Sequence, residues 1–392
     1  MITTFDSSFA GSIDIDNVGY GGTAVNARHH TNEELIGTFE KAEAIAKTLD
    51  RLGYDTMWMA EHHFQPEGYE GIPNIILLAV HLSHLTQNID FGCGFNIAPM
   101  WHPLRLAEDY ATADVLTKGR LRFGVGRGYH SRELESVGAP LLDQDANREL
   151  FEEQVEVIMK AFHQESFSHH GKHYTIPPAV PYRDYILEKI TLVPRPVYRS
   201  ECWQPIQGGT QRQLDFMAKY GIKGTIGGGV AEGGAMENVI VGYRDALRRA
   251  GRETELGEDL NIGFHFWIAK SEEEALRQAA PLFEENLKMF GPLRLHRGLT
   301  DQQMIDINNP LIAPTADLPH IEDAARAGAF LCGTPEMIIE KLMVLGERYP
   351  GLRRITMSHP VATPRAAILE QLERLAKDVM PAFKKEAPAG VS

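Results

Sequence analysis

The stretch GYDTMWMAEHHF, residues 53–64, decides how the chain is expected to fold. Gly53 ends a run of helical spacing over residues 33–52, for which Thr31 is the expected N-cap. Residues 54–60 are predicted to form a compact strand. Polar side chains follow at once in Glu61-His62-His63, where that strand ends. A helix, a short strand and a polar strand end make up the repeating unit of an α/β protein.

The same alternation of strand and helix patterns continues in both directions from this stretch. Further strands are predicted at residues 2–5, 89–97, 121–125, 205–207, 224–226, 262–269 and 354–357. Helices are predicted between them, including residues 73–86, 102–116, 148–162, 212–220 and 335–348. Eight strand–helix units with short connections predict a parallel TIM (β/α)8 barrel. A doubly wound open sheet is the alternative, but its glycine fingerprint is missing after the first strand.

Two segments exceed a minimal barrel and are interpreted as insertions. Residues 163–200 are rich in His, Pro and Tyr and are expected to form an excursion with a small hairpin. Residues 281–334 are charged and interrupted by prolines, and a connection of this length is typical of a lid or binding loop. No sequence repeat or linker divides the chain, so residues 1–392 are expected to form a single domain.

Composition excludes several function classes. The formal net charge of −14 argues against a nucleic-acid or anionic-membrane surface, since both require clustered Lys and Arg. The three cysteines, Cys93, Cys202 and Cys332, are far apart and odd in number, so no disulfide framework or cysteine zinc site is predicted. The longest apolar run, residues 75–80, is too short to span a bilayer, and no signal-peptide pattern begins the chain. A reducing cytoplasm is the expected location.

The polar end of the second strand is the first candidate for chemistry. Active sites of TIM barrels lie at the carboxyl ends of the strands, where Glu61-His62-His63-Phe64 is placed. Adjacent side chains of an extended segment point to opposite faces, so only one of the two histidines is expected to enter the pocket. A histidine there can exchange a proton near neutral pH. The alternative is that both histidines hydrogen-bond carbonyl groups at the barrel end.

Glycine-rich turns after the fourth and fifth strands predict an anion site. The stretch GVGRGYH, residues 124–130, lets a ligand approach the backbone, and Arg127 adds a guanidinium fork. Gly208-Gly209-Thr210 leads into a helix, whose free N–H groups can bind a phosphate. Thr210 could equally be an ordinary N-cap, and Arg148 could supply a second cation or merely cover surface. The combination predicts a phosphate-binding pocket.

Two other kinds of enzyme are disfavoured. The chain has 16 histidines, but their pairs (residues 29–30, 62–63 and 169–170) are adjacent, and adjacent residues rarely converge on one ion. His-x-His and His-Glu-x-x-His patterns are missing, so no catalytic metal is predicted. A Gly-x-Ser-x-Gly elbow is also missing, which disfavours a serine hydrolase.

Several ordered motifs together resemble the bacterial luciferase-like flavin-dependent monooxygenases. They are residues 53–64, HPLRLAED at 102–109, KGRLRFG at 118–124 continuing into Arg127-Gly128, GTPE at 333–336 and DVMP at 378–381. The resemblance covers nearly the whole chain and is weakest over residues 163–200 and 227–330. It implies a TIM barrel that takes reduced FMN from a separate flavin reductase and uses O2, through a flavin hydroperoxide, to oxygenate a small organic substrate. It also implies a homodimer.

The resemblance assigns roles to individual residues. His62 matches the catalytic histidine, a general base near the flavin, and Arg127 and Arg148 match phosphate-binding arginines. Thr210 stands where the family has a phosphate-binding serine, with Gly209 offering a backbone N–H, and Gly94-Phe95 matches a non-prolyl cis peptide beneath the flavin ring. Aromatic candidates for an apolar substrate pocket include Phe64, Trp101 and Tyr129.

The sequence also departs from luciferase itself. Gly126 replaces the reactive cysteine of luciferase, which argues against light emission. The loop beginning Gly227-Gly228-Gly229 is unlike that of luciferase and indicates a different substrate side of the pocket. Residues 281–334 lie where the family has a mobile loop that shields the flavin from water. The alternatives are a deazaflavin-dependent hydride-transfer enzyme, a non-catalytic flavin-binding subunit and, more distantly, a metal-dependent hydrolase.

Overall fold

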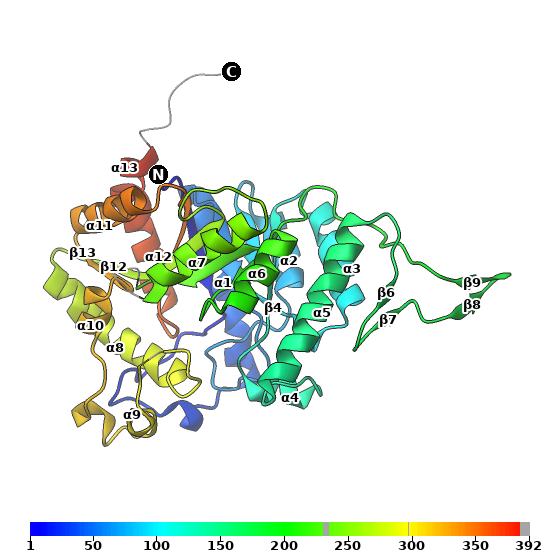
Figure 1. Cartoon of the computed structure of the whole chain (residues 1–392). Helices are drawn as coiled ribbons and strands as arrows, with labels where there is room; N and C mark the ends of the chain where they lie inside the picture. Colours follow the sequence, from blue (N-terminus) through cyan, green and yellow to red (C-terminus); the bar gives the residue numbers. More distant parts are fainter. Residues whose placement is uncertain (230–234, 297, 385–392) are drawn as a thin grey trace.

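Eight parallel strands close into a barrel in the computed structural model, which describes residues 1–229, 235–296 and 298–384 (Figure 1). The barrel strands are β1 (Thr4–Phe9), β2 (Thr56–Met59), β3 (Asp90–Cys93), β5 (Leu121–Gly126), β10 (Cys202–Pro205), β11 (Lys223–Gly227), β12 (Leu260–Ile268) and β14 (Arg354–Ser358). They neighbour one another in that order, and β14 pairs with β1 to close the ring. This closure confirms the TIM barrel and excludes the open doubly wound sheet.

Helices surround the barrel and alternate with its strands (Figure 1). The longer ones are α1 (Asn32–Leu52), α2 (Ile75–Leu85), α3 (Pro103–Leu116), α5 (Gln144–His163), α6 (Gln211–Tyr220), α7 (Ala235–Arg249), α8 (Glu272–Phe290), α11 (Pro335–Arg348) and α12 (Arg365–Arg374). Helix α1 shows why the local sequence folds as expected: Thr31 and Glu34 form a capping box at its start, and Gly53 ends it with φ of 75°. The described helices include none with the length and apolar composition needed to cross a membrane.

Two tryptophans meet in the interior of the barrel. Trp58 of β2 and Trp203 of β10 meet edge to face with ring centroids 5.4 Å apart, although their strands are not neighbours, so both side chains point inward. The Trp58 indole N–H donates to Asp6 at 2.7 Å. Gly92 leaves room for this indole, since a Cβ there would lie 2.2 Å from the Trp58 ring. The interior is therefore a packed core with an open mouth above it.

The inward positions one step beyond the tryptophans carry small side chains. Alternation along the strands places Ala60, Gly94, Gly126 and Pro205 there. On the opposite side of the ring the corresponding positions are Gly227, His265 and Ser358, as the registers of β11, β12 and β14 show. Apart from His265 these inward side chains are small, which leaves room at the mouth.

Charged side chains of alternating sign connect the amino-terminal ends of the strands. Arg122 pairs with Asp90 at 2.9 Å and also with Glu201, and Glu201 pairs with Lys223 at 2.7 Å. Lys223 lies 3.8 Å from Asp259 before β12. These ion pairs cover the end of the barrel away from the mouth.

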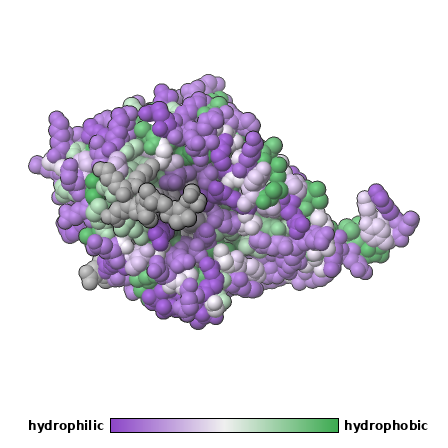
Figure 2. Space-filling model, turned by 90° about the horizontal axis from the view of Figure 1, so that it is seen from above, coloured by the Kyte–Doolittle hydropathy of each residue, from purple (hydrophilic) through white to green (hydrophobic). Residues whose placement is uncertain are grey.

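The first predicted insertion is confirmed as an excursion that carries two hairpins. Its strands are β6 (His169–His170) with β7 (Thr175–Ile176), and β8 (Val180–Tyr182) with β9 (Tyr185–Leu187). The β8–β9 hairpin projects far from the barrel in both views of the molecule (Figures 1 and 2).

The second predicted insertion begins later than the sequence indicated. Helix α8 continues through Pro281 to Phe290, because its buried apolar face, including Ala279, Leu282 and Phe283, holds the helix together despite the missing N–H of the proline. The remaining segment contains α9 (Asp301–Asp306), α10 (Ile321–Arg326) and β13 (Phe330–Gly333), which pairs with β12 outside the ring.

Strand β10 also differs from the prediction, since it spans Cys202–Pro205 rather than residues 205–207. Cys202 and Trp203 pair with Phe123 and Gly124 of β5, a contact between distant segments that fixes where the strand lies. The remaining short elements are η1 (Val25–Ala27), β4 (Asn96–Ile97), η2 (Ala98–Met100), α4 (Ser131–Ser136), η3 (Ala313–Thr315), η4 (Leu375–Val379) and α13 (Pro381–Lys384). The single-domain organisation of residues 1–392 stays a prediction.

Candidate active site

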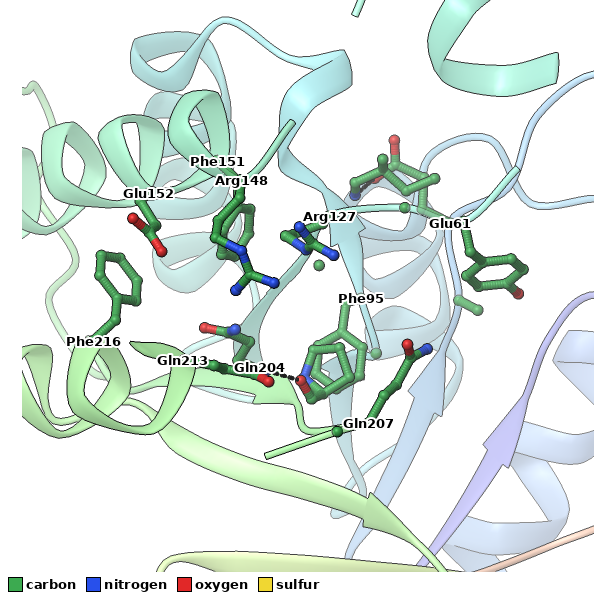
Figure 3. A pocket seen from close by; sticks show the side chains of 18 of the residues that line it. Glu61, Phe95, Arg127, Arg148, Phe151, Glu152, Gln204, Gln207, Gln213 and Phe216 are labelled. Atoms are coloured by element: carbon green, nitrogen blue, oxygen red, sulfur yellow. Dashed lines mark hydrogen bonds between the residues drawn. The ribbon is translucent and has the colours of Figure 1, made fainter. Parts of the chain in front are cut away.

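A cavity of about 380 Å³ opens at the carboxyl ends of β2, β3, β5 and β10, beside helices α5 and α6 (Figure 3). This is the end of a TIM barrel where active sites lie. Seven of the residues singled out from the sequence line it: His62, Gly94, Phe95, Arg127, Tyr129, Arg148 and Thr210. Residues far apart in the chain therefore come together as predicted.

Two arginines at one end of the cavity form no ion pair with the described residues, although Glu152 lies nearby. Arg127 is held by the side-chain oxygen of Gln144 at 3.2 Å, and Arg148 has no hydrogen bond or ion pair with the described residues. Figure 3 shows both guanidinium groups at the same end of the site. Burial, followed by the positive charges of Arg148 and Arg212, lowers the pKa of Arg127. Such mutual repulsion is relieved when an anion binds between the two groups.

The start of helix α6 lies at the same end of the cavity. Thr210 is the N-cap of this helix, and its hydroxyl accepts a long hydrogen bond of 3.4 Å from the Gln213 N–H. Thr210 also lines the cavity, so it can serve both as a cap and as a hydroxyl for a ligand. Gly208 lines the cavity as well, whereas Gly209 makes the turn behind it with φ of 58°. Gly209 can therefore offer its backbone but does not border the cavity.

The floor of the cavity is flat because its side chains are small. Ala60, Gly94, Gly126 and Pro205 border the cavity, beside the ring of Phe95. The Gly94–Phe95 peptide bond is cis, as the family resemblance implied. A Cβ at Gly126 would lie 3.4 Å from the Cβ of Phe95, which is ordinary van der Waals contact.

His62 is buried in the wall of the cavity within a network of acidic groups. Its Nδ1 lies 3.0 Å from Glu133, and its Nε2 lies 2.8 Å from the Tyr129 hydroxyl and 3.2 Å from Glu70. The Tyr129 hydroxyl donates to Glu70 at 2.7 Å. This geometry suits an imidazolium that donates from both ring nitrogens.

The charges of this network shift the pKa values of its members. Burial alone would lower the pKa of His62, but the Glu70 and Glu133 carboxylates outweigh burial and raise it. Burial favours protonated carboxyl groups, yet His62 and the hydrogen bonds around them lower the pKa of both Glu70 and Glu133. Burial, together with Glu70, raises the pKa of Tyr129 well above its ordinary value, so its hydroxyl remains a donor. His62 is thus held ready to give up or accept a proton.

The prediction that only one of the paired histidines enters the pocket is confirmed. His62 lines the cavity, whereas His63 turns away and places its Nε2 2.9 Å from Glu61. Glu61 also accepts hydrogen bonds from the Ile97 N–H and from the Trp101 indole. Glu61 therefore ties the strand end that carries His62 to the neighbouring loop.

Two predicted substrate residues lie elsewhere. Phe64 is 55% exposed and does not line the cavity, since the chain turns at this residue with φ of 59°. Trp101 does not line it either; its indole N–H donates at 2.8 Å to Glu61, which does border the cavity. The prediction of a substrate pocket at Phe64 and Trp101 is corrected accordingly, and Tyr129 alone of the three borders the cavity.

Sequence reasoning missed three members of the His62 network: Glu70, Glu133 and His130. His130 Nε2 lies 3.0 Å from Glu70, on the carboxylate oxygen that does not face His62. Glu70 lies in the loop after β2, whereas His130 and Glu133 lie at and in the short helix α4 after β5, so no local spacing marks them. The sequence does show acidic residues after the predicted ends of β2 and β5, and this was the available signal for the network.

The same network brings together groups that can ligate a metal. One ligand atom each from His62, Glu70 and His130 lie within 4.8 Å of one another, although no adjacent histidine pair is involved. All three groups hydrogen-bond within the network described above. Measuring the metal content of the purified protein would therefore test whether this cluster binds an ion.

Fold and site together define a class of protein. The fold is a TIM barrel, and its mouth has a buried histidine in one wall of the cavity and two arginines at one end. The model of one family, described as luciferase-like monooxygenase, matches residues 20–350. The chain belongs to this family.

Relatives with curated descriptions agree with the family. The oxygenase component of a flavin-dependent trigonelline monooxygenase from Acinetobacter baylyi is 23% identical over 88% of this chain and 90% of its own length. The alkanal monooxygenase alpha chain of the Kryptophanaron alfredi symbiont is 29% identical over 34% of this chain and 36% of its own. An uncharacterised protein of Sinorhizobium fredii is 33% identical over 33% of this chain and 35% of its own. The last two matches thus span about a third of each relative.

Solved structures show the same fold. The oxygenating constituent of 3,6-diketocamphane monooxygenase of Pseudomonas putida, in complex with FMN, has a TM-score of 0.68 at 20% identity, covering 97% of this chain and 98% of that chain. An F420-dependent secondary alcohol dehydrogenase has a TM-score of 0.66 at 13% identity, covering 98% and 99%. At such identities the likeness concerns the fold alone.

Proposed function

We propose that this chain is the oxygenase component of a two-component monooxygenase, which uses reduced FMN and O2 to oxygenate a small organic substrate. The observation that carries the proposal is the pair Arg127 and Arg148, which forms no ion pair with the described residues and lies beside the start of helix α6. The trigonelline monooxygenase relative, itself an oxygenase component, supports it. Family membership supports the reaction type.

The residues of the cavity fit FMN. Arg127, Arg148, the Thr210 hydroxyl and the first amides of α6 would hold the phosphate, because they offer positive charge and donors at one end of the cavity. The small floor of Ala60, Gly94, Gly126 and Pro205, with Phe95, would accept the planar ring, because no large side chain stands there. The phosphate end and the floor thus suit the two halves of one molecule.

Reduced FMN, when bound, supplies the electrons that activate O2. The chain contributes a proton at His62, which itself lines the cavity beside Tyr129. Glu133 orients the ring of His62 through Nδ1, and Glu70 fixes Tyr129. His62 can act as a general base when neutral and as an acid when protonated.

Several further expectations belong to the same proposal. A separate flavin reductase would supply reduced FMN, the enzyme would act in the cytoplasm as a homodimer, and Gly126 in place of the luciferase cysteine fits oxygenation without light. Within residues 281–334, the part that follows α8 would shield the site as a lid.

The test begins with anaerobic titration of the purified chain with reduced FMN, with coenzyme F420 as the alternative ligand. Stoichiometric binding of FMN, followed by O2 consumption that a candidate substrate accelerates, is the expected result. Binding of F420 but not FMN would replace the proposal with hydride transfer. A His62→Ala variant that binds FMN and retains full oxygenation would remove His62 from the reaction, whereas a wild-type chain that binds FMN but never consumes O2 would be a non-catalytic subunit.

A further inference from the structure

Residues 180–199 form an arm that exposes a large share of the apolar side chains on the molecular surface. Among the described residues 22 large apolar side chains are exposed, and seven of them lie in this arm of 20 residues out of 392. They are Val180, Tyr182, Tyr185, Ile186, Val193, Val197 and Tyr198. Single exposed apolar residues are normal on a protein surface, but a concentration of them marks a surface that contacts another molecule.

The tip of the arm is the β8–β9 hairpin, which forms a sheet of two strands without a third. The register places Tyr182 opposite Tyr185, and on the same face Val180 lies opposite Leu187. The two tyrosine rings meet edge to face with centroids 5.8 Å apart, and the guanidinium carbon of Arg183 lies 5.3 Å from the centroid of the Tyr182 ring. An isolated two-stranded hairpin is at best marginally stable in water, so this apolar face requires a surface that covers it.

The root of the arm is fixed on the body of the molecule. The buried carboxylate of Asp114 on α3 accepts hydrogen bonds from the backbone N–H groups of residues 197–199, at 2.7, 2.8 and 3.1 Å. Val115 and Leu116, which follow Asp114 at the end of α3, are 40% and 55% exposed. Apolar surface therefore continues from the arm onto the end of α3, and Figure 2 shows apolar residues both on the projecting hairpin and on the adjoining part of the body.

The arm also differs in charge from the rest of the chain. It carries four basic and two acidic side chains, whereas the whole chain has 39 basic and 53 acidic side chains. The basic residues are Arg183, Lys189, Arg195 and Arg199, and the acidic residues are Asp184 and Glu188. Of the four basic residues only Arg199 is ion-paired within the described part of the chain, with Asp90 at 2.9 Å. A basic arm on a strongly acidic molecule complements the surface of a second copy of the same chain.

We propose that the arm packs against a second copy of this chain, with the aromatic face of the hairpin on the partner's body and the basic side chains on its acidic surface. A stable interface takes about 20–30 residues from each side, and the arm with the exposed end of α3 supplies about that number. Most homodimers have twofold symmetry, so two arms would be exchanged and both apolar faces covered. This contact goes beyond the expected homodimer, because it names the segment that holds the copies together, and it does not depend on FMN.

Analytical ultracentrifugation of the purified chain over a dilution series tests the contribution of the arm. The wild type is expected to sediment as two copies. The triple variant Tyr182→Ser/Tyr185→Ser/Ile186→Ser removes three half-exposed apolar side chains and should raise the dissociation constant of the dimer about 100-fold. These side chains lie at the surface, so the variant should keep the circular dichroism spectrum of the wild type.

A matched control removes equally exposed apolar side chains elsewhere. Ile305→Ser/Leu311→Ser/Ile312→Ser changes residues in and after α9, which lies on the other side of the molecule from the hairpin (Figure 1). This variant should leave the dissociation constant of the dimer unchanged.

Cross-linking identifies what the arm contacts. The three cysteines of the chain are buried, so Tyr182→Cys introduces a single accessible thiol that benzophenone-4-maleimide can label. Irradiation of the labelled variant is expected to give a species of twice the chain mass on a denaturing gel. Labelled Ile305→Cys, on α9, should not give that species.

Three outcomes would overturn the proposed contact. They are a wild type that stays monomeric, a triple variant that dimerises as tightly as the wild type, and a labelled arm that cross-links only within its own chain. A monomer whose labelled arm cross-links only to an added flavin reductase would assign the arm to that partner instead. Failure of the wild type to bind FMN would overturn the proposed function and leave each of these measurements unaffected.

Discussion

Replacing Arg148 by methionine should weaken FMN binding and at the same time stabilise the empty protein. Methionine keeps the apolar stem of the arginine and removes only its charge and donors. In the structure this guanidinium has no partner among the described residues, while it lowers the pKa of the neighbouring Arg127. The residue therefore costs the free protein some stability and gains its partner only when an anion binds.

The two effects differ in size as well as in sign. A hydrogen bond to a charged group contributes about 1.5–3 kcal/mol, so Arg148→Met should raise the FMN dissociation constant roughly 10- to 150-fold. Removal of a like-charge contact near the surface should raise the free energy of unfolding of the FMN-free chain by about 0.2–1 kcal/mol, the range of exposed ion pairs. Riboflavin has no phosphate, so its dissociation constant should not change.

The assay is equilibrium titration with FMN and with riboflavin, alongside urea unfolding of the FMN-free variant. Arg212→Met is the matched control, because Arg212 lies nearby but is exposed and already paired with Glu152 at 2.6 Å. That variant should lose little affinity for either flavin. The reasoning is refuted if Arg148→Met binds FMN as the wild type does, if riboflavin is weakened equally, or if the empty variant is less stable.

Three further outcomes follow from the same structure. Glu133→Gln removes a carboxylate that raises the pKa of His62. The limb of the pH–rate profile that reports His62 should therefore move about one pH unit lower, while the affinity for FMN stays the same. A limb that does not move would mean that another group titrates. Burial opposes the ionisation of Glu201, but Arg122 and Lys223 lower its pKa from 4.5 to about 2, so it stabilises the fold above pH 4.5 and loses that effect as the pH falls toward 2. The difference in unfolding free energy between wild type and Glu201→Gln should therefore be largest near pH 6 and vanish near pH 2, and a constant difference would contradict this. Dialysis against a chelator should leave oxygenation intact, and a loss that only a divalent metal restores would show a catalytic metal among His62, Glu70 and His130.

Local signals in the sequence predicted much of the barrel. The Thr31 cap and Gly53 end of α1 are set by side chains within a few residues, so the sequence displays them directly. Pro281 misled the prediction because a proline usually ends a helix, whereas the buried face of α8 outweighs that cost. The bounds of β10 depend on its pairing with β5, which no local pattern reveals.

The candidate site was predictable where one segment carries both the motif and its position. His62, Arg127 and Thr210 each lie within about five residues of a strand end, so their place at the mouth follows from the barrel alone. Glu70 lies in the loop after β2 and Glu133 in α4 after β5, so their contact with His62 depends on how these two segments fold against each other. The prediction for Phe64 was wrong because the chain turns at this residue, so Phe64 lies at the surface although it is adjacent to His63 in the motif.

The packed tryptophan pair below the cavity gives the protein a built-in optical reporter. Trp58 and Trp203, two of the chain's four tryptophans, lie one inward position below the floor on which the flavin ring would rest. Indole emission overlaps flavin absorption, so a ring bound there would quench the emission by energy transfer. Occupancy of the site can thus be followed by intrinsic fluorescence, without a label and without turnover.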